Sequence, residues 1–147
     1  LAERLPREPG SEEYLDSEKY QIRHWDLDRE DSLAPLIGRL NAIRRSHPAL
    51  QSNERLAFHE TSGDHLLAYS KRTADGSDVV LTVVNLDPLH AHAGTVQLDL
   101  AAVGLDPGST YEVHDLLDGV TYRWWGATNY VELAPQVRPA HVFEVRR

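Results

Sequence analysis

The sequence predicts a mainly β protein in which one amphipathic helix precedes an antiparallel β-sandwich. From residue 56 onward, apolar and polar residues alternate with a period of two in eight short runs. Turn residues such as Asp75-Gly76 and Asp118-Gly119 separate the runs, and no helical pattern lies between them. Repeated short strands without intervening helices are typical of an antiparallel sandwich.

We expect the strands at residues 56–60, 65–72, 78–86, 94–100, 110–117, 120–125, 129–134 and 141–147. The run at residues 79–84 is apolar on both faces, which is typical of a central strand. Trp124 and Trp125 are neighbours on one strand, so their side chains point to opposite faces. They therefore cannot form one flat sugar-binding surface, and at least one should lie in the core.

The predicted helix runs from Leu33 to about Ser46. Asp31 or Ser32 can cap its first turn, and Pro48 ends it. Its apolar residues recur at helical spacing: Leu33, Leu36, Ile37, Leu40 and Ile43. A single apolar stripe next to a sandwich needs a partner to cover it, so we expect that partner upstream of this chain.

Composition excludes several classes of function. The net charge of −8, with no cluster of Lys or Arg, argues against nucleic acid as a partner. The apolar runs are too short to span a bilayer, so we expect a soluble, cytoplasmic protein. The chain contains no methionine, even at position 1, so we interpret it as part of a longer protein.

The sequence gives no sign of a metal or a cofactor. Of the eight histidines, His90 and His92 are the closest pair, but no third ligand stands near them at the spacing of a metal site. We therefore interpret them as ordinary surface histidines and predict neither a metal nor a cofactor. No glycine-rich phosphate loop and no Ser/His/Asp order is present either.

The segment SEEYLDSEKYQIRHWD, residues 11–26, follows neither a helical nor a strand period. It combines several acids with aromatic residues and a lone lysine, Lys19. Its local structure does not explain this composition. Long irregular segments of this kind are usually functional or disordered.

Several motifs resemble a known family. LNAIRRSHPAL resembles the last helix of the catalytic barrel, and the entry to the following β domain, in glycoside hydrolase family 13, the α-amylase superfamily. GSEEYLDSEKYQIRHWD, VVNLDP, YEVHDLLDG and NYVELAP resemble the actinobacterial alpha-1,4-glucan:maltose-1-phosphate maltosyltransferases of that superfamily. The resemblance implies that residues 1–50 end a (β/α)8 barrel, with the loop after strand 8 and helix 8, and that residues 51–147 form an α-amylase-type C-terminal β-sandwich.

The resemblance also assigns roles to residues. In a barrel, the loop after strand 8 lies at the catalytic face. The family's Lys-Tyr pair contacts the bound maltosyl unit, which implies that Lys19 and Tyr20 bind substrate. The catalytic carboxylates of the family would lie before Leu1, so this chain should contain no catalytic residue. We accordingly do not interpret the acids of the segment as a catalytic pair: Glu12, Glu13, Asp16 and Glu18.

The activity that the resemblance implies is transfer of maltosyl from α-maltose 1-phosphate to the non-reducing end of an α-1,4-glucan. It proceeds with retention and release of phosphate, without a cofactor, in a protein that is usually a homodimer. Two alternatives stay open. One is another family 13 enzyme, such as a trehalose synthase or an amylase, and the other is a non-catalytic carbohydrate-binding β-sandwich.

Overall fold

The computed structural model describes residues 6–15, 22, 26 and 28–147. The chain divides into two compact units, Leu1–Arg39 and Leu40–Arg147, so the predicted helix crosses the division between them. The second unit contains all eight strands. Among the described residues, no helix is both long enough and apolar enough to cross a membrane.

The elements follow the order α1 (Ala34–Ser46), η1 (Pro48–Gln51), β1 (Leu56–Thr61), β2 (Leu66–Arg72), β3 (Val79–Asn85), β4 (His92–Gln97), α2 (Leu100–Val103), β5 (Thr110–Asp115), β6 (Thr121–Trp125), β7 (Thr128–Leu133) and β8 (Ala140–Arg146). All eight predicted strands and the predicted helix are therefore confirmed. The short helix α2 was not predicted, because four residues are too few to show a helical period, and its first residue, Leu100, was assigned to the fourth strand. The Asp99 side chain caps α2 by accepting a hydrogen bond from the backbone N–H of Ala102, at 3.1 Å.

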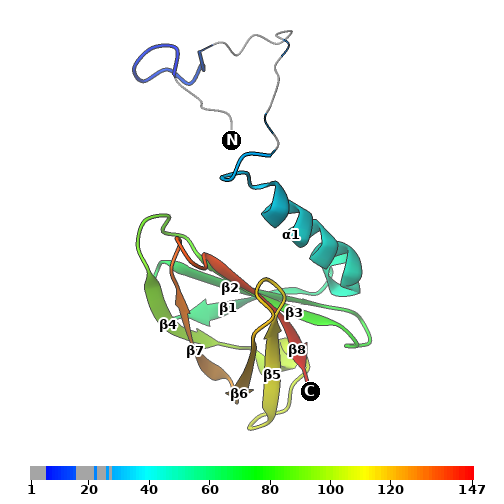
Figure 1. The fold of residues 1–147 in the computed structure, drawn as a ribbon. Helices are drawn as coiled ribbons and strands as arrows, with labels where there is room; N and C mark the ends of the chain where they lie inside the picture. Colours follow the sequence, from blue (N-terminus) through cyan, green and yellow to red (C-terminus); the bar gives the residue numbers. More distant parts are fainter. Residues whose placement is uncertain (1–5, 16–21, 23–25, 27) are drawn as a thin grey trace. The chain divides into compact units, whose positions relative to one another are not determined.

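The strands form one antiparallel sheet in the order β6-β5-β8-β3-β2-β1-β4-β7. β6 and β7 follow one another in the chain but lie at opposite ends of this order, so the sheet curls over its own core. In Figure 1 the ribbon of β4 and β7 lies to the left of β5 and β6. The result is the mainly β, sandwich-like fold that the sequence predicts.

The join between β1 and β4 is short. In its register, Glu60 lies opposite Gln97 and Thr61 lies opposite Val96. Two hydrogen bonds between Ser62 and Thr95 extend it, one from the Ser62 N–H to the Thr95 carbonyl at 2.9 Å and one from the Thr95 N–H to the Ser62 hydroxyl at 2.7 Å. A Cβ at residue 94 would lie 2.7 Å from the Ser62 carbonyl oxygen, so this contact requires a glycine there.

The main core lies between the two halves of the curled sheet. β3 is the fourth strand in the order and is buried along almost its whole length, as predicted for residues 79–84. Trp124 is buried in this core at 7% exposure, whereas Trp125 is 67% exposed, which confirms that the two side chains divide between the faces. The largest fully buried side chains include Tyr111, Phe143, Leu81 and Leu133.

A smaller apolar cluster covers the other face of β3 and β8. Ile43 from the end of α1 and Ala49 from η1 pack with Val80 and Val142 there. The carboxylate of Asp78 fixes this arrangement, because it accepts a hydrogen bond from the Ala49 N–H at 2.9 Å and lies 2.9 Å from Nδ1 of His47. The last turn of α1 is thus attached to the sandwich.

Candidate functional site

The two predicted substrate-binding residues, Lys19 and Tyr20, lie outside the described residues, as do Asp16 and Glu18. Their assignment to a sugar site therefore stays a prediction. The described residues on either side of them form two ordered turns, at residues 6–15 and 28–32.

The first turn is a short hairpin-like loop. Pro6 and Tyr14 form an isolated antiparallel bridge, and the Arg7 N–H donates to the Glu13 carbonyl at 2.7 Å. Gly10, with φ of 83°, lies near its tip. The Glu13 side chain is exposed and pairs with Arg7 at 3.3 Å. A carboxylate in such an exposed ion pair does not have the rigid, desolvated setting that a glycosidase acid or nucleophile needs.

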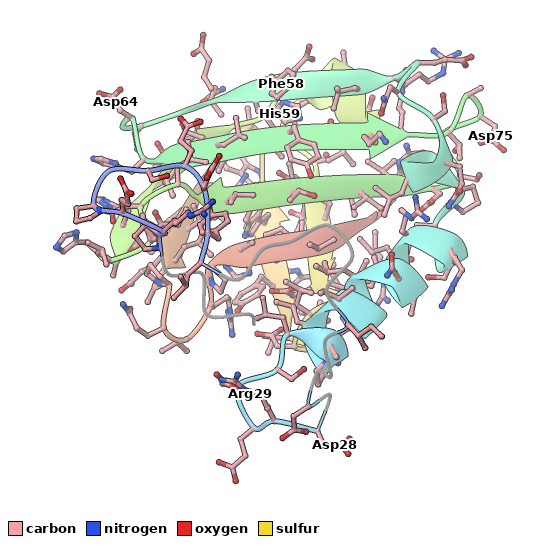
Figure 2. All side chains as sticks on the ribbon, turned by 90° about the horizontal axis from the view of Figure 1, so that it is seen from above. Asp28, Arg29, Phe58, His59, Asp64 and Asp75 are labelled. Carbon is pink, nitrogen blue, oxygen red and sulfur yellow. The ribbon has the colours of Figure 1, made fainter. Side chains whose placement is uncertain are left out.

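The second turn leads into α1 and is held by an ion pair. Arg29 donates two hydrogen bonds to Asp31, at 2.8 Å from Nε and 2.7 Å from Nη2 (Figure 2 shows Arg29 in this turn). The bond from Arg29 holds the pKa of the Asp31 carboxyl below its usual range. The hydroxyl of Ser32 accepts from the Ala34 N–H at 3.2 Å. Of the two predicted caps, Ser32 therefore makes this contact.

The apolar stripe of α1 is largely uncovered. Leu36 is 43% exposed, Ile37 is 53% exposed and Leu40 is 41% exposed, whereas Ile43 is buried. Large apolar side chains that share one face of a helix normally lie against another element. The face is therefore suited to contact with a further part of a protein.

A small pocket opens beside β6, β7 and β8. Its lining includes Tyr122, Trp124, Tyr130, Glu132, Arg138, His141 and Phe143. The rings mostly pack on one another: those of His141 and Phe143 are stacked 4.5 Å apart at 19°, and Trp124 meets Phe143 edge-on at 5.4 Å. Ring faces that are covered in this way are not free to stack on a ligand.

The polar groups at the rim of the pocket also bond to neighbours. Nη1 of Arg138 donates to the Tyr122 hydroxyl at 2.8 Å, and Arg138 forms an ion pair with Asp118. The Tyr130 hydroxyl donates to the Glu132 carboxylate at 3.1 Å, and this hydrogen bond raises the pKa of Tyr130. The polar groups at the rim are therefore occupied by contacts with one another, which indicates that they have a structural role.

A buried hydrogen-bonded pair lies at the pocket. Nδ1 of His141 is 2.6 Å from Oδ2 of Asp115, with the two side chains 5% and 0% exposed. Burial by itself raises the pKa of Asp115, but the bond from His141 and those from the N–H groups of Leu117 and Val142 outweigh it, so the pKa lies below its usual range. The pair thereby connects the end of β5 to β8.

An Asp-His pair is also found in nucleophilic catalytic triads. The third residue of such a triad is a nucleophile, so a catalytic role would require one near His141. Among the described side chains that line this pocket, none is a serine, threonine or cysteine. Within this described lining, the pair has no nucleophile to activate. We interpret it as a structural contact of the sandwich.

A second cluster of titratable groups lies elsewhere, and the sequence analysis missed it. His65, Asp87 and His92 each place one potential ligand atom within 4.8 Å of the others. His65 precedes β2, Asp87 lies in the β3–β4 loop and His92 begins β4. Asp87 stands three and five residues before His90 and His92, a local spacing that could have indicated it, whereas His65 joins the cluster through the pairing of β2 with β3.

Comparison with solved structures shows that another protein contains the same fold. The chain resembles the maltogenic alpha-amylase AmyB from Thermotoga neapolitana with a TM-score of 0.62 and 12% sequence identity, over 81% of this chain and 26% of that one. At this identity the likeness concerns the fold alone. The chain shares its fold with a part of that amylase.

Sequence comparison then gives the family. Residues 58–145 match the family model described as GLGE, C-terminal, and the chain belongs to that family.

Curated relatives match almost the whole chain. Alpha-1,4-glucan:maltose-1-phosphate maltosyltransferase 2 of Streptomyces coelicolor is 53% identical over 151 residues, covering 100% of this chain and 22% of the relative. Proteins named alpha-1,4-glucan:maltose-1-phosphate maltosyltransferase in Corynebacterium glutamicum and Methylacidiphilum infernorum are 50% and 41% identical, over 92% and 99% of this chain. The chain spans about a fifth of the length of these relatives.

Proposed function

We propose that this chain is the C-terminal portion of an alpha-1,4-glucan:maltose-1-phosphate maltosyltransferase. Such an enzyme transfers maltosyl from α-maltose 1-phosphate to the non-reducing end of an α-1,4-glucan, retains the anomeric configuration and releases phosphate. The observation that carries the proposal is the high identity to proteins of this name across essentially the whole chain, including the irregular acidic segment. A trehalose synthase or an amylase is accordingly the less favoured alternative.

The chain has two roles in this proposal. Residues 1–50 complete the catalytic barrel with the loop after its eighth strand and its last helix, and residues 51–147 form the β domain that stabilises the barrel. The exposed face of α1, with Leu36, Ile37 and Leu40, supports this division because a barrel helix needs strands to cover it. Ile43 and Ala49 would hold that helix against the β domain.

Lys19 and Tyr20 bind the maltosyl unit in this proposal. An ammonium group donates to several sugar hydroxyls at once, and a phenol donates, accepts and packs its ring on the apolar face of a sugar. The catalytic carboxylates belong to barrel strands outside this chain. The chain alone is therefore inactive, and its substrates meet it only as part of the whole enzyme, which is cytoplasmic, homodimeric and free of cofactors.

Phosphate release tests the proposal. The full-length protein, incubated with α-maltose 1-phosphate and an α-1,4-glucan, should release phosphate and lengthen the glucan, whereas the chain alone should release none above buffer. Interconversion of maltose and trehalose, or hydrolysis of the glucan without use of maltose 1-phosphate, would assign the protein to a different family 13 activity.

A further inference from the structure

We propose that His65, Asp87 and His92 form a binding site for a divalent first-row transition metal such as Zn²⁺, which acts as a structural clip between the two parts of the curled sheet. The proposal does not involve Lys19 or Tyr20 and assigns the metal no part in maltosyl transfer. It contradicts the expectation, drawn from local spacing, that these histidines hold no metal.

The ligand atoms already lie close to one another. Nε2 of His92 is 2.9 Å from Oδ2 of Asp87, and the rings of His65 and His92 stack at 4.1 Å with an angle of 20° between their planes. One ligand atom from each of the three residues falls within a span of 4.8 Å. Metal–ligand bonds of about 2 Å place neighbouring ligands roughly 3 Å apart, so small side-chain movements suffice to close the site.

A fourth ligand stands beside them. Nδ1 of His90 lies 2.9 Å from the same oxygen of Asp87, and its side chain is 73% exposed. Two or three imidazoles with one carboxylate, completed by water, are a common donor set for Zn²⁺ and also suit Ni²⁺, Co²⁺ and Cu²⁺. Ca²⁺ and Mg²⁺ prefer oxygen ligands and should bind poorly.

The backbone around Asp87 is fixed before any metal arrives. Oδ1 of Asp87 accepts the N–H groups of Leu89 and His90, at 2.8 and 3.2 Å, which leaves Oδ2 for the ring nitrogens. The buried Asn85 side chain accepts the Asp87 N–H at 2.9 Å and donates to the carbonyls of His90 and Leu133. A carboxylate held in this way loses little conformational freedom on binding a metal.

The position of the site gives the clip its role. β4 is joined to β1 by two paired positions and the Ser62–Thr95 contact, but it pairs with β7 along six positions. A metal held by His92 at the start of β4 and by His65 at the start of β2 would tie the β4–β7 ribbon to the rest of the sheet a second time. Figure 2 shows Asp64, the neighbour of His65, at the opposite end of these strands from Asp75.

Calorimetric titration of the metal-free chain with Zn²⁺ tests the proposal. We expect saturable binding of one ion per chain with a dissociation constant in the micromolar range or tighter, unaffected by millimolar Mg²⁺. His65→Ala and His92→Ala should each weaken binding at least about ten-fold, since even the loss of an outer-shell partner costs that much. His114→Ala is the matched control, because His114 lies on β5 and bonds to Thr121.

Stability and hydrogen exchange distinguish a structural metal site from nonspecific metal binding. Zn²⁺ should raise the melting temperature and slow hydrogen exchange in β4 and β7, and chelator should reverse both effects. Both effects should persist in His114→Ala and disappear in the His65→Ala/His92→Ala double variant, whose fold is checked by circular dichroism. Binding weaker than about 100 μM, or equal binding by the double variant, would overturn the proposal.

Discussion

His141 and Asp115 form a buried pair, with Nδ1 of His141 2.6 Å from Oδ2 of Asp115 and both side chains almost completely inaccessible. The pair joins the end of β5 to β8, and its geometry leaves neither group exposed to water. Removal of one partner should leave the other buried without compensation.

Asp115→Ala should therefore lower the free energy of unfolding by roughly 3 kcal/mol or more, because it leaves the buried His141 ring and the N–H groups of Leu117 and Val142 without their acceptor. Urea denaturation followed by tryptophan fluorescence measures this change. Asp118→Ala is a suitable comparison, because its ion pair with Arg138 is partly exposed and should contribute about 1 kcal/mol or less. Equal losses in the two variants would contradict the structural role assigned to the buried pair.

The pH dependence of stability should include a contribution from His59. Its Nδ1 accepts the Asp99 N–H at 3.1 Å, which requires an unprotonated nitrogen. Burial lowers the pKa of His59, and the charge of Asp99 only partly offsets this effect. Because the folded pKa is below the unfolded value of about 6.5, this stability is present in full above that pH and is lost as the pH falls through the folded pKa.

We therefore expect unfolding free energy to fall between about pH 7 and pH 5, and the fall to be smaller in His59→Gln. Urea denaturation at several pH values measures the slope for both proteins. His114→Gln replaces a histidine elsewhere in the sheet and serves as the control. A slope unchanged in His59→Gln would show that this histidine does not titrate differently in the folded state.

The two adjacent tryptophans should behave very differently. Trp124→Ala should cost about 3–5 kcal/mol of unfolding free energy because it leaves a cavity in the core. Trp125→Ala, at an exposed position on the other face, should cost less than about 1 kcal/mol. Both values come from the same denaturation experiment, and similar losses would mean that the assigned faces are wrong.

The exposed apolar face of α1 should make the isolated chain self-associate and bind hydrophobic dyes. Replacing Leu36 and Leu40 by Gln should reduce binding of a hydrophobic dye and any self-association, with little effect on unfolding free energy. Ile43→Ala should instead cost about 2 kcal/mol or more, because Ile43 packs in the cluster over β3 and β8. A monomeric chain that binds no dye would weaken the assignment of α1 as a barrel helix.

The strands could be predicted from the sequence because the runs alternate between buried and exposed residues. Turn residues between consecutive runs mark where each strand ends. Helix α2 was missed because its four residues are too few for a period, although Asp99 before it and Gly104 after it, with φ of 71°, are the residues expected at its caps. A capping pattern was thus the available signal.

The spacing of Asp87, His90 and His92 was an available signal that was not used, whereas His65 is brought to Asp87 only when β2 pairs with β3. The division of Trp124 and Trp125 followed from strand geometry alone. The sugar site could not be predicted from sequence patterns. Lys19 and Tyr20 were assigned by family resemblance alone, because neither periodicity nor spacing indicates what they bind.

Steady-state kinetics of Lys19→Ala in the full-length protein tests the proposed sugar site most directly. If Lys19 donates to the maltosyl unit, kcat/KM for maltose 1-phosphate should fall about ten- to a hundred-fold, the loss expected for a charged hydrogen bond of roughly 1.5–3 kcal/mol, with an unchanged melting temperature. Tyr20→Phe, measured beside it, tests the second member of the pair. Unchanged kinetics in both variants, with or without a small loss of stability, would contradict the assignment of this segment to the sugar site.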